Sequence, residues 1–203
     1  MSRRPLKRLL LKGFLFLVLS LLLWVYVLQP PYSRLLVSVS QKVHSWVEKK
    51  EKTLIQLQGD MIVFVPQGLA TQEQKGIPAG KRDVRELDYN SVILITLILF
   101  SPGLRAGKRM LVLVAGFALL FLTHVLNVLV QVKFFYALQL GGYGQIPYGP
   151  WERNIYAFLK QFFELIGRFA FPFAIWMLFT YKETTGYLTG AESEKKPHKK
   201  RKR

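Results

Sequence analysis

Residues 9–28 read LLLKGFLFLVLSLLLWVYVL, an apolar run that only Lys12 interrupts. A transmembrane α-helix needs about 20 mostly apolar residues, so this run predicts a membrane span. The run follows a basic stretch, as the apolar part of a signal peptide does. It ends in bulky residues, however, and Gln29-Pro30-Pro31 follows it without a small-residue cleavage site. We therefore expect an uncleaved membrane anchor.

The composition of the whole chain agrees with a membrane protein. Hydrophobic residues make up 51% of the 203 residues, and the formal net charge is nevertheless +17. A soluble domain with so much charge is usually poorer in apolar residues, because self-repulsion opposes compaction. The chain has no cysteine, which excludes disulfides, thiolate zinc sites and a cysteine nucleophile.

Three further apolar segments have the length expected of spans. They cover residues 87–104, 110–130 and 155–181, and the helical pattern of the second of them continues toward Leu140. Together with residues 9–28, they predict an all-α membrane protein with four transmembrane helices. Four spans place both ends of the chain on the same side of the membrane.

The basic residues indicate which side that is. They gather in residues 1–12, in the turn 105–109 and in the tail 182–203, whereas basic and acidic residues nearly balance in 29–86. Basic residues that flank spans stay in the cytoplasm, so both termini and the 105–109 turn should be cytoplasmic. The segments 29–86 and 131–154 should be extracytoplasmic loops.

The run Lys199–Arg203 also has the composition of a nucleic-acid-binding patch. Apolar spans precede it, which favours a disordered, topogenic tail that contacts anionic membrane lipids. We therefore expect lipid as the partner of this tail and no nucleic acid.

The first extracytoplasmic loop should contain regular structure. Leu36, Val39, Val43 and Trp46 recur at helical spacing within residues 33–49, which predicts an amphipathic helix on the membrane surface or on the spans. Residues 53–58 and 61–65 are apolar-rich and flank Gly59-Asp60, which predicts a β-hairpin. Residues 67–81 contain several Gly and Pro residues and are expected to form a loop.

Ionisable residues inside spans are costly and mark candidate sites. Helical spacing places His124, Asn127 and Gln131 on one face of the third span, and Lys160, Glu164 and Arg168 on one face of the fourth. Counted from Met110 and Tyr181, Asn127 and Glu164 lie at equal depth. His124 then lies level with Arg168, and Gln131 level with Lys160. The two spans should therefore pack together through these polar faces.

This candidate intramembrane polar cluster allows several functions. It can be a structural seam of hydrogen bonds between helices. It can also be an enzyme site at the outer membrane face, with His124, Asn127 and Glu164 involved and His124 or Glu164 as acid or base, or the proton path of a small transporter subunit. The chain has no phosphate-binding glycine loop, no His-Glu-x-x-His and no Gly-x-Ser-x-Gly, so we expect no cofactor or metal. Ser101, before Pro102-Gly103, is interpreted as a helix stop.

The segment from Asp88 to Phe171 resembles the exosortase/archaeosortase family of prokaryotic membrane transpeptidases. That family has a catalytic cysteine at the outer end of one span, a basic cytoplasmic turn, an Asn-x-x-Arg motif, and a histidine followed by a glycine four residues later. Asn90-Ser91 falls near the cysteine position, and Arg105–Arg109 matches the basic turn. Asn127 and Gly167 match the asparagine and the glycine. Val130 stands at the arginine position and Phe163 at the histidine position.

The resemblance implies a relative without the catalytic groups, similar to the exosortase H-associated membrane proteins. It further implies a bacterial envelope system that processes proteins with a C-terminal sorting signal. We therefore expect a multi-pass protein of the bacterial inner membrane that is a non-catalytic accessory subunit, with a membrane protein such as an exosortase as its partner.

Overall fold

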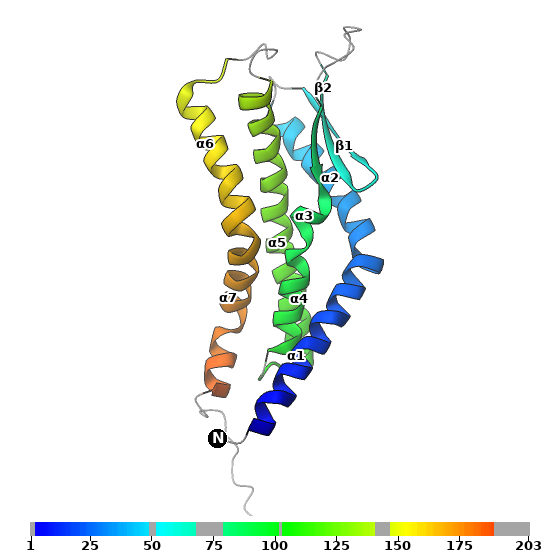
Figure 1. Cartoon of the computed structure of the whole chain (residues 1–203), viewed down its shortest axis with the longest axis vertical. Helices are drawn as coiled ribbons and strands as arrows, with labels where there is room; N and C mark the ends of the chain where they lie inside the picture. The colour runs from blue at the N-terminus through cyan, green and yellow to red at the C-terminus, as the bar shows by residue number, and fades with distance from the viewer. Residues whose placement is uncertain (1–2, 49–51, 68–78, 102, 141–146, 189–203) are drawn as a thin grey trace, which may run out of the picture.

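The computed structural model describes residues 3–48, 52–67, 79–101, 103–140 and 147–188. In these ranges the chain forms an elongated bundle of helices with a small β-sheet at one end (Figure 1). We call this the sheet end. Helix α1 (Arg3–Leu23) begins and helix α7 (Arg168–Leu188) ends at the opposite end of the bundle.

The first helix is much longer than the predicted span. From α1 it continues through a π-helical segment (Trp24–Leu28) into α2 (Gln29–Val47) without leaving the helical region. No break in the helix therefore separates the predicted span from the predicted loop at residue 29. Pro30 and Pro31 lie in the first turn of α2, directly after the widened π-helical turn. A proline inside a continuous helix cannot donate to the preceding turn, and the π-helical segment accommodates this break in the hydrogen-bond pattern.

The amphipathic pattern of residues 33–49 does form a helix, and most of its predicted apolar stripe packs inward. Leu36 is buried, and Val39 and Val43 pack against the same core, whereas Trp46 is 82% exposed. The polar residues Ser33, Ser40 and His44 are buried as well. This face packs on the sheet and on α5 (Ala106–Phe134). The helix therefore continues the first span and packs on α5, which is one of the two predicted placements.

The predicted hairpin is confirmed. Strands β1 (Thr53–Gln58) and β2 (Met61–Pro66) pair antiparallel around Gly59-Asp60. Gly59 has φ +60°, which the first position of a type II′ turn requires and which glycine adopts without steric cost. Gln41 of α2 covers the free edge of β1, because its side chain accepts a hydrogen bond from Ile55 N (2.6 Å) and donates one to Thr53 O (3.2 Å).

A third strand was not predicted. Strand β3 (Gly80–Asp83) pairs antiparallel with β2, although Gly80 and Lys81 belong to the predicted loop 67–81. Residues 68–78 of that loop lie outside the described residues. The sequence Gly-Lys-Arg-Asp has no strand periodicity, and its conformation comes from its neighbours. A Cβ atom at Gly80 would lie 2.8 Å from Phe64 Cδ2 and 2.9 Å from Phe135 Cδ2, so only glycine fits there.

The predicted second span, residues 87–104, is not confirmed as a membrane-crossing helix. Its place is taken by α3 (Val84–Asp88) and α4 (Asn90–Phe100), and α4 has 11 residues, about 16 Å of helix. Within the described residues, three helices are long and apolar enough to cross a membrane: Gly13–Val47, Ala106–Gln139 and Pro150–Gly186. Helix α4 can be short because it lies inside the bundle, in contact with α1, α5 and α7.

Ser101 ends α4, as predicted for a helix stop. Its hydroxyl donates to Leu97 O (2.7 Å) and accepts a hydrogen bond from Trp176 Nε1 (2.6 Å). The guanidinium of Arg109 donates to Ser101 O (2.9 Å). Ser101 thus ties α4 to the neighbouring α5 and α7.

Helix α5 continues through a π-helical segment (Phe135–Gln139), as the predicted continuation toward Leu140 requires. It begins at Ala106, so most of the predicted turn 105–109 is helical. The last helix exceeds its predicted limits. Helix α6 (Pro150–Gln161), a π-helical segment (Phe162–Gly167) and α7 follow one another, beyond the predicted 155–181. The predicted loop 131–154 and tail 182–203 are therefore partly helical; residues 141–146 and 189–203 lie outside the described residues. Packing on the sheet and on neighbouring helices extends these helices past their apolar parts.

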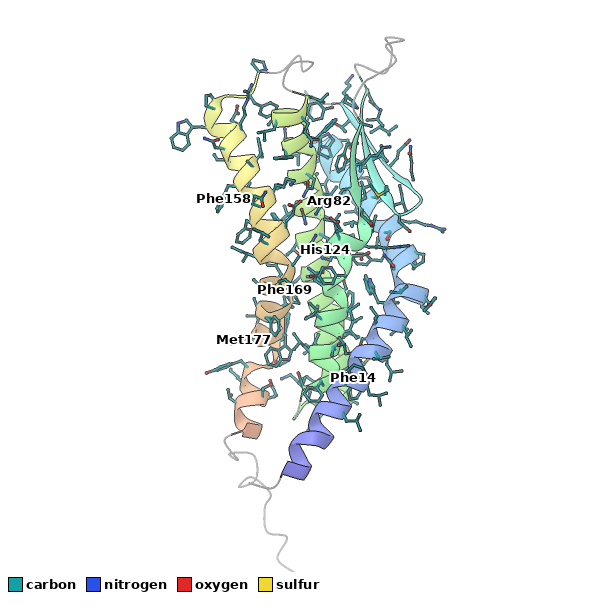
Figure 2. All side chains as sticks on the ribbon, viewed as in Figure 1. Phe14, Arg82, His124, Phe158, Phe169 and Met177 are labelled. Carbon is teal, nitrogen blue, oxygen red and sulfur yellow. The ribbon has the colours of Figure 1, made fainter. Side chains whose placement is uncertain are left out.

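Apolar side chains cover the outer faces of the bundle. Figure 2 labels Phe14 on α1 and Phe158, Phe169 and Met177 on the α6–α7 side, all directed away from the bundle. Each is half exposed or more. An apolar surface of this kind is what a bilayer covers, in agreement with a membrane protein.

Candidate functional site

Glu164 is the centre of an ion-pair network near the sheet end. It lies in the π-helical segment between α6 and α7, and its side chain is 16% exposed. Glu164 Oε1 is 2.8 Å from Arg82 Nη1 and accepts a hydrogen bond from Gln131 Nε2 at 3.3 Å. Glu164 Oε2 accepts from Lys160 Nζ at 3.0 Å. One carboxylate therefore joins strand β3, helix α5 and the α6–α7 helix.

A second carboxylate extends the network. Glu86 of α3 is 2.8 Å from Arg82 Nη2 and 3.5 Å from Arg168 Nη2. We call Arg82, Glu86, Lys160, Glu164 and Arg168 the sheet-end network. Its cations also lie on aromatic rings: Lys160 Nζ is 4.8 Å from the centroid of Phe134, and Arg168 Cζ is 5.7 Å from that of Tyr89. Alternating charges and ring faces together offset the cost of partial burial.

The predicted contact between the two polar helix faces is present, but one turn away from the predicted register. Gln131, not Asn127, contacts Glu164, and Asn127 Oδ1 accepts from Gln131 Nε2 at 3.4 Å. The prediction counted from Met110 and Tyr181, whereas the helices end at Ala106 and Leu188. Counted from these ends at about 1.5 Å per residue, Gln131 and Glu164 lie at about 37 and 36 Å.

Sequence reasoning missed the two residues that complete the network. Arg82 and Glu86 belong to the segment that was expected to be an extracytoplasmic loop. Their spacing of four residues is the only local signal, and it becomes meaningful once α3 is known to follow β3. Figure 2 labels Arg82 in the interior of the bundle, nearer to the sheet end than His124.

His124 does not belong to the network. It is 2% exposed, and both of its ring nitrogens are engaged. Nδ1 is hydrogen-bonded to the hydroxyl of Tyr32, and Nε2 is 2.8 Å from Asn90 Oδ1. A neutral imidazole satisfies both contacts, because Nε2–H donates to the amide oxygen and Nδ1 accepts from the phenol. His124 therefore links α2, α4 and α5 in a separate buried polar group.

Asp88, Ser91 and Trp24 lie beside this group and are also buried. The Asp88 carboxylate lies beside the Trp24 indole, outside hydrogen-bonding geometry. Within the described residues, Ser91 Oγ has no hydrogen-bond partner, so Ser91 and His124 do not form a nucleophile–base pair. Phe163, at the position of the family histidine, packs its ring against Phe162 and Phe171.

The sheet-end network and the His124 group can hold the helices and the sheet together. Most of their polar side chains are already engaged in hydrogen bonds or ion pairs with each other. Across the described ranges, no group of three or more His, Asp or Glu side chains could hold a metal ion. The six residues predicted from sequence thus divide into the network contacts of Gln131, Lys160, Glu164 and Arg168, the neighbouring Asn127, and the separate His124.

Comparison with known proteins identifies the family. The family model described as exosortase H-associated membrane protein matches residues 3–183, which include the sheet-end network and the His124 group. The chain belongs to this family, as the sequence resemblance predicted. No curated protein and no solved structure matches the chain.

Proposed function

We propose that this member of the exosortase H-associated membrane protein family is a non-catalytic accessory subunit of an exosortase-type sorting system in the bacterial inner membrane. The observation that carries the proposal is the use of the candidate acid–base groups in internal contacts. His124 is hydrogen-bonded at both nitrogens, and Glu164 binds two cations and an amide. A general acid or base must instead reach the proton that it transfers.

The composition of the chain supports the same proposal. A thiolate is the usual nucleophile in sortase-type chemistry, and the chain contains no cysteine. Ser91, near the corresponding position, is fully buried and lacks a base. Loss of nucleophile and base together removes most of the rate of such enzymes, often about 10⁶-fold.

The proposal includes a topology of four passes with both termini in the cytoplasm. Helices α3 and α4 lead the chain back from the sheet: a Cβ atom at Gly13 would lie 3.6 Å from Phe100, so α4 ends beside the lower part of α1. The basic segments 3–12 and 105–109 lie toward the same end as the last turn of α7. The positive-inside rule assigns this end to the cytoplasm and the sheet to the outside.

Reporter fusions are expected to bear this topology out. A reporter that is active only outside the cytoplasm should work when inserted near residue 70 and fail when fused after residue 203, because a net basic end is retained inside. An insertion after Gly103, in the connection between α4 and α5, is the matched control and should also be inactive. Activity of the fusion after residue 203 contradicts the four-pass topology.

The accessory role predicts that partner binding persists when acid–base chemistry is removed. We expect the chain to co-purify with an exosortase in mild detergent and to cleave no sorting-signal peptide when alone. His124→Gln keeps a donor and an acceptor for Tyr32 and Asn90 but cannot transfer protons, so processing in cells should stay within about twofold of wild type.

Ser91→Ala is the companion variant, since it removes the serine hydroxyl near the family nucleophile position. A His124→Gln protein that folds, still binds the exosortase and abolishes processing would establish the enzyme interpretation instead. Failure of the wild-type chain to co-purify with any exosortase, with normal processing in its absence, would refute the accessory role.

A further inference from the structure

A groove of about 300 Å³ lies between the first long helix and the turn of the hairpin. Its volume is at the lower end of the range of small-molecule sites, about 300–1,000 Å³. Both walls combine apolar and charged side chains. The residues that line it include Val25, Pro30, Arg34, Leu57, Asp60 and Arg85. This groove is distinct from the sheet-end network, which uses none of them.

The groove lies at the level where a lipid headgroup would be. The apolar run of the first span ends at Leu28, and Arg34 lies about 9 Å further along the helix at about 1.5 Å per residue. The polar region of a bilayer extends about 5–8 Å beyond the hydrocarbon on each side. An arginine side chain at this position can reach back to the phosphate level.

Within the described residues, the groove holds a positive charge that no carboxylate neutralises. Arg85 forms an ion pair with Asp60, which holds the hairpin turn against α3. Arg34 is exposed and, in the part of the chain that the structure describes, makes no hydrogen bond or ion pair. The Arg34 guanidinium, with its planar set of donors, is therefore available to an anion of planar or tetrahedral geometry.

Apolar surface continues from the groove along α1. Val25 forms part of the groove wall, and Leu21 and Leu22, one turn before it, are about half exposed. An occupant with a charged head and a hydrocarbon chain would satisfy both parts of this surface. A soluble anion would leave the apolar part without a partner.

We propose that the groove binds the headgroup phosphate of a membrane glycerophospholipid, with Arg34 donating to the phosphate oxygens. Arg85 and Asp60 are paired and add no net charge to the site, so the attraction to the phosphate comes from Arg34. One acyl chain lies along Val25 and the leucines before it. Such a lipid fills the space between the first helix and the hairpin and so links the sheet to the membrane surface.

Native mass spectrometry of the full chain in detergent tests the proposal. The wild-type protein should retain added phosphatidylglycerol, and Arg34→Gln should retain it about tenfold less, because one charge-assisted contact to phosphate is lost. Arg34→Lys should keep most of the binding. Arg34→Gln should fold normally, since Arg34 contacts no described residue through a hydrogen bond or ion pair.

Arg153→Gln is the matched control, because Arg153 is an exposed arginine of α6 at the same end of the bundle. It should bind phosphatidylglycerol as wild type does. Diacylglycerol, which has the same chains without phosphate, and inorganic phosphate alone should both bind much more weakly. Equal retention by Arg34→Gln and Arg153→Gln overturns the site, and retention of inorganic phosphate as strong as that of the lipid overturns the assignment to a lipid.

Discussion

Replacing Glu164 with leucine is expected to lower the free energy of unfolding by about 2–4 kcal/mol, since Lys160 then lies partly buried without its carboxylate and Arg82 keeps only the half-exposed Glu86. Complete burial of such a pair would give a cost at the upper end of about 3–5 kcal/mol. The exposed fractions of 16–20% in this cluster place the expected value somewhat lower. Denaturant titration of the purified protein in one fixed detergent measures it.

Glu86→Leu is the matched control. Glu86 also bridges two cations, but its side chain is 50% exposed, so solvent screens its ion pairs. Its loss should cost about 1 kcal/mol or less. An effect of Glu164→Leu as small as that of Glu86→Leu would show that the network contributes no more than surface ion pairs do.

The double variant Arg82→Met, Glu164→Leu separates loss of attraction from an unpaired charge. Replacement of both members of a buried pair by apolar residues of similar size is often nearly neutral. We therefore expect the double variant to be more stable than Glu164→Leu alone. If the free-energy losses of Arg82→Met and Glu164→Leu add up to that of the double variant, the destabilisation does not come from leaving Arg82 without Glu164.

The second large effect is expected from Phe135→Ala, which should cost about 3–5 kcal/mol. Phe135 is 2% exposed, its ring centroid lies 6.5 Å from that of Phe64 in β2, and Gly80 of β3 approaches it closely. Truncation leaves a cavity between the sheet and the end of α5, which the glycine at position 80 cannot fill. The substitution should therefore loosen the structure around the sheet in addition to lowering the free energy of unfolding.

Hydrogen exchange of the backbone amides distinguishes this local effect from general destabilisation. Protection should fall first in β2 and β3, whereas α4 near Ser101 should change little, because it belongs to another buried cluster. Phe158→Ala, at a side chain that is 67% exposed on α6, is the control and should leave stability nearly unchanged. Equal loss of protection in all elements would contradict the local role of Phe135.

The sequence predicts those features of the molecule that depend on interactions between residues close together in the chain. Apolar runs and helical spacing depend on neighbouring residues alone, so the sequence predicted the membrane class, the first, third and fourth long helices, and the hairpin at Gly59-Asp60. It also selected Gln131, Lys160 and Glu164, because polar residues in apolar helices need partners. Family membership followed from residues spread over the same segments.

Tertiary structure alone decided the features that need a contact between distant segments. β3 is a strand because β2 pairs with it, and α4 stays short because other helices surround it. His124 is held by Tyr32 and Asn90, and Glu164 by Arg82, which lie 92, 34 and 82 residues away along the chain. No local periodicity encodes such partners, because they are set by how the helices and the sheet pack and by the rule that buried polar groups find hydrogen bonds wherever the fold places them.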